Sequence, residues 1–171
     1  FEDAESQLRR AVALVPDYPD GLSNLAVVLD ESQRPGEALD LLDRALSINP
    51  NHIESNNNRG NILRDMDRFD EAVACFETAL RLFPEFGDAY VNLGLTQQYM
   101  GRQDDAIATL RCGLEVLPED PNLHWNLALT LLQIGDYAAG WDEYEWRWRM
   151  PKFQVFARTV AQPLWQGEDL A

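Results

Sequence analysis

The chain has 171 residues, 46% of them hydrophobic, and carries a formal net charge of −15 at pH 7 with a single lysine, Lys152. Phosphate binding requires clustered cations, so this charge argues against nucleic acid or an anionic membrane surface and favours neutral or basic protein partners. Two cysteines are too few for a disulfide framework, and the absence of a long apolar run or a leader-like segment favours a cytoplasmic protein without a membrane span.

A period of 34 residues runs through the chain. It is carried by a proline column (Pro16, Pro50, Pro84, Pro118), an asparagine column (Asn24, Asn58, Asn92, Asn126) and a column of small residues (Ala26, Gly60, Gly94, Ala128). A repeat of this length predicts an all-α solenoid of paired helices. The small residues mark the positions where neighbouring helices approach most closely.

In chain order, residues 1–18 are predicted to hold the second helix of a truncated repeat, and full repeats follow at 19–52, 53–86 and 87–120. In the third of these, helical spacing predicts helices over 88–100 and 104–116, separated at Gly101 and ended by Pro118. Residues 121–150 form the last predicted repeat. Residues 151–171 show no repeat and are predicted to be a cap or a linker to a further domain.

The last repeat ends in an aromatic segment, GWDEYEWRWRM, which the register places on its second helix. At 100° per residue, Trp141, Tyr144 and Trp148 share the side that other repeats use for their core, so we predict that they are buried. Trp146 and Met150 point the other way. With Trp165 of the tail, they are predicted to form an exposed surface that another domain or the tail itself covers.

The sequence resembles the tetratricopeptide repeat (TPR) family over Phe1 to about Met150. The stretch YVNLGLTQQYMGRQDDAIATLRCGLEVLP, which ends at Pro118, has the aromatic, Leu-Gly, small and proline positions of the family in register. The chain departs from the family pattern at Arg59, Gln97 and Pro35. The resemblance implies a right-handed superhelix of about 4.5 repeats, whose first helices line a concave face that binds peptides or domains.

The asparagine column lies in the middle of these first helices, where asparagine costs up to about 0.7 kcal/mol relative to alanine. The resemblance places the column in the groove, and a similar ladder is found in the TPR arm of O-linked N-acetylglucosamine transferases. Such carboxamides could hold the backbone of an extended peptide. The alternative is that they hydrogen-bond within or between repeats.

Groove positions one turn from the ladder differ along the array. Toward the N-terminal end they are polar or acidic: Asp20, Ser23, Asp30, Glu31, Glu54, Asn57 and Asn61. Toward the other end they are apolar: Val91, Leu95, Tyr99, Trp125, Leu129 and Leu132. We therefore predict a graded groove, one half of which prefers a basic or polar stretch while the other receives apolar side chains. Alternatively, several of these apolar residues complete packing between helices.

Catalytic motifs are missing from the sequence, and its two histidines, His52 and His124, are interpreted as structural. Cys75 and Cys112 are interpreted as buried small residues. We predict a non-catalytic fragment without cofactor or metal.

The segment GDYAAGWDEYEWRWRM followed by PLWQGEDLA is similar to the junction at which bacterial TPR arrays precede a glycosyltransferase-like domain. The sequence thus predicts a protein- or peptide-binding scaffold, which could be the substrate-recognition arm of such a transferase. The alternatives are a free-standing adaptor and a scaffold that self-associates through its exposed ends.

Overall fold

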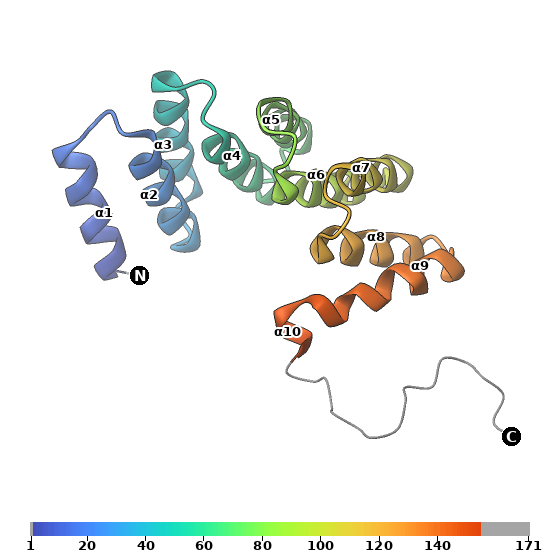
Figure 1. Ribbon diagram of the computed structural model, residues 1–171. Coiled ribbons are helices and arrows are strands. Elements are labelled where there is room, and N and C mark those ends of the chain that lie inside the picture. Colours follow the sequence, from blue (N-terminus) through green and yellow to red (C-terminus); the bar gives the residue numbers. More distant parts are fainter. Residues whose placement is uncertain (1, 155–171) are drawn as a thin grey trace, which may run out of the picture.

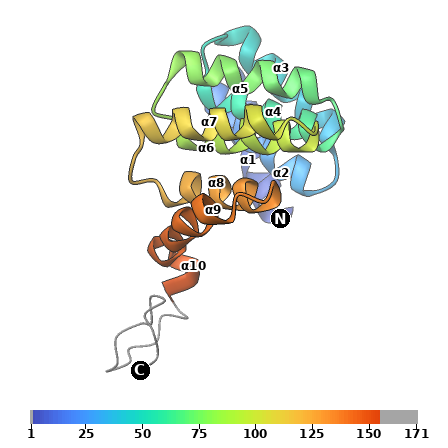
Figure 2. The same ribbon diagram turned by 90° about the vertical axis from the view of Figure 1, so that its right-hand side faces the viewer.

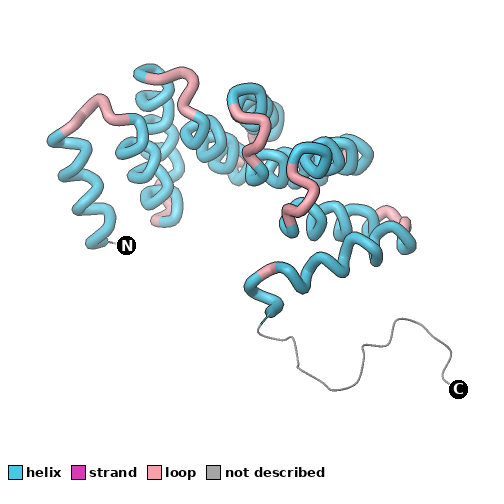
Figure 3. The backbone as a smooth tube through the Cα atoms, viewed as in Figure 1, coloured by secondary structure: helices cyan, strands magenta, loops and turns pink. Residues whose placement is uncertain are grey.

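The computed structural model describes residues 2–154, and helices are the only regular elements in that range. They are α1 (Glu2–Leu14), α2 (Pro19–Glu31), α3 (Pro35–Ile48), α4 (Ile53–Asp65), α5 (Phe69–Leu82), α6 (Gly87–Tyr99), α7 (Gln103–Val116), α8 (Pro121–Gln133), α9 (Tyr137–Tyr144), the 3₁₀ helix η1 (Glu145–Arg149) and α10 (Pro151–Gln154). After α1 the helices pair as α2/α3, α4/α5, α6/α7 and α8/α9, joined by short turns (Figure 3). The predicted all-α solenoid of about 4.5 repeats is confirmed.

The pairs are arranged along an arc (Figure 1). Consecutive first helices lie close together, α2 with α4, α4 with α6 and α6 with α8, whereas within residues 2–154 the backbone of α5 does not approach that of α3 or α7 in this way. The first helices therefore line the inner face and the second helices lie outside. Figure 2 shows α3 and α5 toward one end of the view and α10 toward the opposite end.

The turn inside each pair has the same backbone geometry. The residues with positive φ are Gln33 (62°), Asp67 (60°), Gly101 (75°) and Gly135 (88°), each 34 residues from the next. In each turn the following amide donates to the carbonyl five residues back, as Arg34 N does to Leu29 O at 3.0 Å, which satisfies carbonyls at the end of the first helix. A left-handed residue at this position ends the first helix and lets the second fold back against it.

The core lies between the helices of each pair and extends to the next pair. Small residues of the first helix meet large residues of the second: an ideal Cβ on Gly60 would lie 2.6 Å from the ring of Phe76, and one on Gly94 would lie 3.1 Å from Leu110. Phe76 and Leu110 are fully buried. At Gly60 even the Cβ of alanine would press on the Phe76 ring, and a larger side chain at either position would separate the pair.

Candidate functional site

The asparagine column lies on the inner face, with one residue in each of the four first helices. Asn58 Nδ2 donates to Ser23 Oγ at 3.1 Å, and Asn92 Nδ2 donates to Asn57 Oδ1 at 3.1 Å. Both bonds join a first helix to the preceding one with the same sequence offset of 35 residues. These amides thus stabilise the contact between neighbouring repeats.

The ladder changes beyond α4. Asn92 Oδ1 also accepts a hydrogen bond from Arg64 Nη1 at 3.4 Å, so both ends of this carboxamide are engaged. The residue equivalent to Ser23 and Asn57 for Asn126 is Val91, whose side chain has no acceptor. Asn126 Nδ2 donates instead to its own helix, to Asn122 O at 2.8 Å.

Part of the ladder makes no side-chain hydrogen bond within residues 2–154. Asn24 is exposed and its side chain makes no hydrogen bond with any of residues 2–154, and the amide oxygens of Asn58 and Asn126 accept none there. Each inter-repeat bond uses one N–H group of an asparagine amide, and the amide oxygen stays without a partner at Asn58 but not at Asn92.

A polar pocket with a cavity volume of about 240 Å³ lies between α2 and α4. It is lined by Val27, Asp30, Glu31, Asn58, Asn61, Ile62, Arg64 and Asp65. Its three carboxylates face a single guanidinium, Arg64, whose Nε lies 3.0 Å from Asp65 Oδ1. Burial raises the pKa of Asp30, Asp65 and Glu31 raise it further, and Arg64 lowers it. The pocket therefore has an excess of negative charge at a partly desolvated site.

Asn61, in the wall of this pocket, has a buried amide oxygen that accepts no hydrogen bond within the described range. A buried acceptor without a donor is costly, so a donor supplied by a ligand would stabilise it. Of the residues that line the pocket, Asp30, Glu31 and Asn61 are among the predicted groove positions, whereas Arg64 and Asp65 are not. The signal was available, because Arg64 and Asp65 occupy the columns of Asp30 and Glu31 one repeat later.

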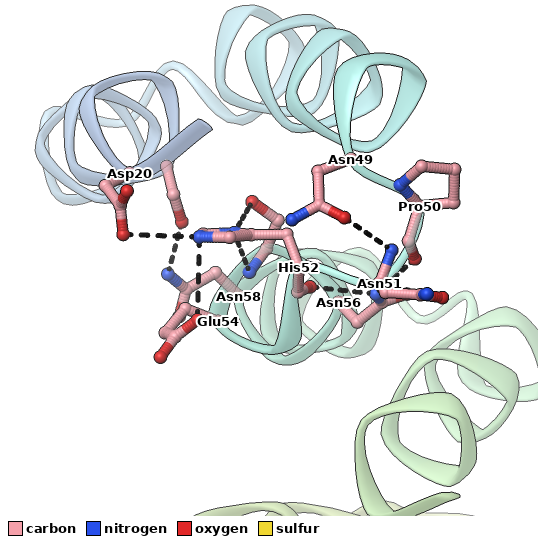
Figure 4. A network of polar contacts seen from close by, with 10 residues as sticks. Asp20, Asn49, Pro50, Asn51, His52, Glu54, Asn56 and Asn58 are labelled. Atoms are coloured by element: carbon pink, nitrogen blue, oxygen red, sulfur yellow. Dashed lines mark hydrogen bonds and ion pairs between the residues drawn. The ribbon is translucent and has the colours of Figure 1, made fainter. Parts of the chain in front are cut away.

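His52 connects the turn before α4 to α2 (Figure 4). Its Nδ1 accepts from the Ser55 backbone N–H at 3.2 Å, which caps α4, so Nε2 carries the proton and faces Asp20 Oδ1 at 3.3 Å. Asn56 Nδ2 secures the same turn by donating to His52 O at 2.9 Å. Asp20 and Glu54, two of the predicted acidic groove positions, therefore lie beside a structural histidine.

The apolar positions predicted for the other half of the groove have mixed surroundings. Val91 packs against the buried cluster that joins α7 and α8, and Leu95 is half-buried. Trp125 packs between Tyr144 and Phe153, with ring centroids 5.0 and 4.9 Å away. Tyr99 is 68% exposed and stacks on Phe69 of α5 at 6.2 Å. Tyr99 is thus the most accessible of the four.

The C-terminal aromatic segment is where the predictions of burial fail. Met150 is buried, and Trp146 is half-buried and stacks on His124 with ring centroids 3.7 Å apart. Conversely, Trp141 is 55% and Trp148 38% exposed. The predicted exposure of the Trp146–Met150 surface is therefore wrong, as is the predicted burial of these two tryptophans. Trp165 lies outside the described residues.

Two physical reasons account for these errors. First, the α-helix ends at Tyr144 and continues as the 3₁₀ helix η1, which turns about 120° per residue and rotates every later side chain away from its α-helical position. Second, Trp141 of α9 occupies a column that inner repeats cover with the next first helix, and no such helix lies within residues 2–154. Periodicity alone cannot detect either change.

The second histidine also has structural partners. His124 Nδ1 contacts the Glu143 carboxylate, and Nε2 lies 2.9 Å from Pro118 O. Its ring, Trp146 and the Arg149 guanidinium form a stack, with Arg149 Cζ 4.0 Å from the centre of Trp146. This stack holds η1 against α8.

The cysteines differ from one another. Cys75 is buried, as predicted, and burial raises the pKa of its thiol although Arg59 Nη1 lies 3.2 Å from its sulfur. Cys112 is exposed, so its predicted burial is wrong: its column lies on the outer side of the second helices. Within the described part of the chain, no group of three or more His, Cys, Asp or Glu residues is arranged to hold a metal ion, and no helix has the length and apolar character of a membrane span.

Comparison with known proteins agrees with this architecture. Two family models described as tetratricopeptide repeat match residues 1–57 and 52–119. No curated protein matches the chain. Among solved structures, MamA of Desulfovibrio magneticus RS-1 has a TM-score of 0.72 at 19% identity, covering 90% of this chain and 86% of its own.

Two further solved structures are similar over most of the chain. PilF of Pseudomonas aeruginosa has a TM-score of 0.76 at 26% identity, covering 85% of this chain and 66% of its own. YrrB, described as a TPR protein with an unusual peptide-binding site, has a TM-score of 0.67 at 19% identity, covering 87% of this chain and 77% of its own. At these identities the likeness concerns the fold.

Proposed function

Because the chain belongs to the tetratricopeptide repeat family, we propose that it is a non-catalytic scaffold that binds a protein or an extended peptide along the inner face of its first helices. Support comes from the continuous inner surface of α2, α4, α6 and α8 and from the fold it shares with YrrB, which has a peptide-binding site. The partner is neutral or basic.

The observation that carries this proposal is the polar pocket between α2 and α4. Asp30 and Glu31 make no ion pair within the described residues, and the only cation in the wall, Arg64, is already paired with Asp65. An ammonium or guanidinium group entering the pocket would neutralise this excess and lower the pKa of Asp30. The pocket therefore favours a lysine or arginine side chain of the bound segment.

The asparagine column contributes acceptors to the same surface. Asn24 and the amide oxygens of Asn58 and Asn126 are positioned to receive backbone N–H groups of an extended peptide, whereas Asn92 is engaged within the protein. Toward α8, Val91, Leu95, Tyr99 and Trp125 supply the apolar half of the groove. A segment with a basic residue at one end and apolar residues at the other matches this arrangement.

The similarity of the C-terminal segment to a TPR–glycosyltransferase junction places this scaffold, in our proposal, as the substrate-recognition arm of a larger transferase-like protein. In that setting the groove selects the acceptor polypeptide and another domain carries the chemistry. The alternative, a self-associating scaffold, predicts a mass that increases with concentration in the absence of any peptide.

The decisive experiment selects peptides from a random displayed library with the full chain as bait, and then measures their dissociation constants by calorimetry. Selected peptides are expected to carry lysine or arginine, and affinity should fall at least about tenfold in Asp30→Asn/Glu31→Gln because about 1.4 kcal/mol is lost from the charged contact. The control is Glu77→Gln/Glu115→Gln, which removes the same charge from exposed positions on the outer helices α5 and α7. Equal losses in both variants would refute the assignment of the pocket.

A further inference from the structure

The positions that form the polar pocket recur one and two repeats later. The pocket takes its wall from the last turns of α2 and the second half of α4. Adding 34 to the number of each wall residue gives an equivalent set of positions between α4 and α6, and adding 68 gives another between α6 and α8. We call the pocket the first step and these two sets the second and third steps. A segment that lies along the inner face crosses the three steps in order.

The first step lacks positive charge. Its wall holds three carboxylates but one guanidinium, that of Arg64, which is paired with Asp65. The amide oxygen of Asn61 is buried there and accepts no hydrogen bond within residues 2–154. The ammonium or guanidinium group of a ligand would supply both the missing charge and a donor for this oxygen. The first step therefore favours a basic side chain.

The second step is neutral, and its ion pair is made within the protein. Arg64 and Asp65 belong to this step as well, because they occupy the columns of Asp30 and Glu31 one repeat later. Their Nε and Oδ1 atoms lie 3.0 Å apart, and Arg64 Nη1 also lies 3.4 Å from Asn92 Oδ1. No charge at this step is therefore left for a ligand to neutralise.

The third step has no charged residue. At positions that hold polar side chains in the first step, it has Tyr99, Leu129 and Leu132. The amide of its Gln98 is already used, because Nε2 donates to Thr130 Oγ1 at 2.8 Å. Tyr99 is 68% and Leu129 41% exposed. The third step therefore offers an apolar surface to a ligand.

The distance between the first and third steps determines how far apart two side chains of a ligand must be. Helices that pack directly have axes about 8–10 Å apart, so two steps span about 16–20 Å. An extended strand advances about 3.3 Å and a polyproline II helix about 3.1 Å per residue, so six residues span about 19–20 Å. Side chains return to the same side every two residues in a strand and every three in polyproline II. A separation of six satisfies both periods and the distance, whereas four residues span only about 13 Å.

We propose, on the basis of the peptide-binding function proposed above, that the inner face selects an extended segment in which a lysine or arginine and a large apolar residue stand six positions apart. The basic side chain enters the first step, between α2 and α4. The apolar side chain lies on Tyr99 and Leu129 at the third step. The residue midway between them faces the neutral second step and is free to vary. Spacing as well as composition therefore distinguishes a ligand.

A series of synthetic peptides tests this spacing. Each peptide has blocked termini, a threonine-rich host that favours extended backbone, and one lysine and one leucine four to eight positions apart, in either chain order. Dissociation constants from NMR titrations of the full chain should show one optimum, at six positions, in one of the two orders. Affinity at five or seven positions should be at least about tenfold lower, because the leucine then points away from the third step. Replacing the middle residue should leave affinity unchanged.

Variants of the protein show which side chain occupies which step. In Asp30→Asn/Glu31→Gln, exchanging the peptide lysine for glutamine should no longer weaken binding, whereas exchanging the leucine for alanine should still do so. Leu129→Ala should give the opposite pattern. The matched control is Val116→Ala, because Val116 of the outer helix α7 is 40% exposed and Leu129 is 41% exposed. This control should retain both losses.

The outcomes separate this proposal from the function on which it rests. Equal affinity at all separations, with binding that still depends on Asp30 and Glu31, would refute the spacing and leave the peptide-binding function standing. An optimum at any separation other than six would refute the spacing in the same way. If no peptide of the series binds, the proposed function is contradicted and the spacing with it.

Discussion

Gly60 provides the sharpest test of how the repeats pack. An ideal Cβ at this position would lie 2.6, 2.7 and 2.9 Å from three ring atoms of Phe76, and Phe76 is fully buried, so its ring cannot move into solvent. Overpacking of this kind costs about 1–3 kcal/mol. Replacing a helical glycine by alanine gains about 0.5–1 kcal/mol. Gly60→Ala should therefore lower the free energy of unfolding by about 1 kcal/mol.

Gly36→Ala is the matched control. Gly36 lies in the first turn of α3, and its ideal Cβ meets no atom within 4 Å. Here only the backbone effect remains, so the same substitution should stabilise the protein by about 0.4–1 kcal/mol. Urea unfolding of both variants, followed by circular dichroism, should thus give changes of opposite sign.

A double-mutant cycle identifies the contact responsible. Ala26, the equivalent of Gly60 in the preceding repeat, packs in one cluster with Leu42, the equivalent of Phe76, which indicates that leucine in the second helix accommodates alanine in the first. Phe76→Leu should therefore rescue part of the loss in Gly60→Ala, with a coupling of about 1 kcal/mol. Equal stability of Gly60→Ala and Gly36→Ala, or additive losses in the double variant, would refute this explanation.

Three further predictions concern polar and backbone positions. Asp67→Gly should raise the free energy of unfolding by up to about 1 kcal/mol in urea titrations, because Asp67 has a φ of 60° that glycine adopts without strain. Asp30→Asn should stabilise the protein at neutral pH, because folding raises the pKa of the Asp30 carboxyl above 3.8 and the stability of the wild type therefore falls as the pH rises through that pKa. In thermal melts, the difference in stability between variant and wild type should vanish below pH 3.8. Asn92→Ala should cost about 1 kcal/mol through its lost bond to Asn57, whereas Asn24→Ala should be neutral or stabilising by up to about 0.7 kcal/mol; equal effects on urea midpoints would contradict the bonding described here.

Much of the fold follows from the sequence because the constraint is repeated. A small residue at one position can be accidental, but small residues recurring every 34 positions indicate that two helices pack closely in every repeat. The residues of the turns show where this kind of prediction reaches its limit. At Gly101 and Gly135 the residue type itself predicts a left-handed conformation. Gln33 and Asp67 adopt the same conformation, and there it can be predicted only from the 34-residue period.

Burial in the C-terminal aromatic segment was predicted wrongly because the prediction assumed a constant α-helical period, which does not hold there. The α-helix changes to 3₁₀ geometry after Tyr144, and Trp146 in this 3₁₀ helix stacks on His124 of α8, a contact that helical periodicity does not report. Burial of Trp141 depended on a helix assumed to follow it. The 34-residue register therefore predicts where α9 lies in the sequence, but it does not predict which side chains of α9 are buried.

The asparagine column shows why the groove and the repeat interface must be understood together. Two interpretations of the column seemed to compete: hydrogen bonds between repeats, or bonds to a peptide. The geometry of Asn58 allows both, because the amide nitrogen donates to Ser23 while the oxygen remains available on the inner face. Because the amide nitrogen carries two N–H groups, Asn58 still has one N–H and its oxygen without a partner among residues 2–154.

The contact between consecutive first helices is different at α6 and α8. Val91 stands there in place of the acceptor residues Ser23 and Asn57, and the side-chain hydrogen bond runs instead from Gln98 Nε2 to Thr130 Oγ1 at 2.8 Å. The carboxylates of the pocket lie near the hydrogen bond from Asn58 of α4 to Ser23 of α2. The apolar positions begin at Val91 of α6, where this type of bond is no longer made. In the function proposed above, the bound segment places its cation toward α2 and its apolar side chains toward α8. The change in the bonds between repeats therefore coincides with the change in groove chemistry that we propose.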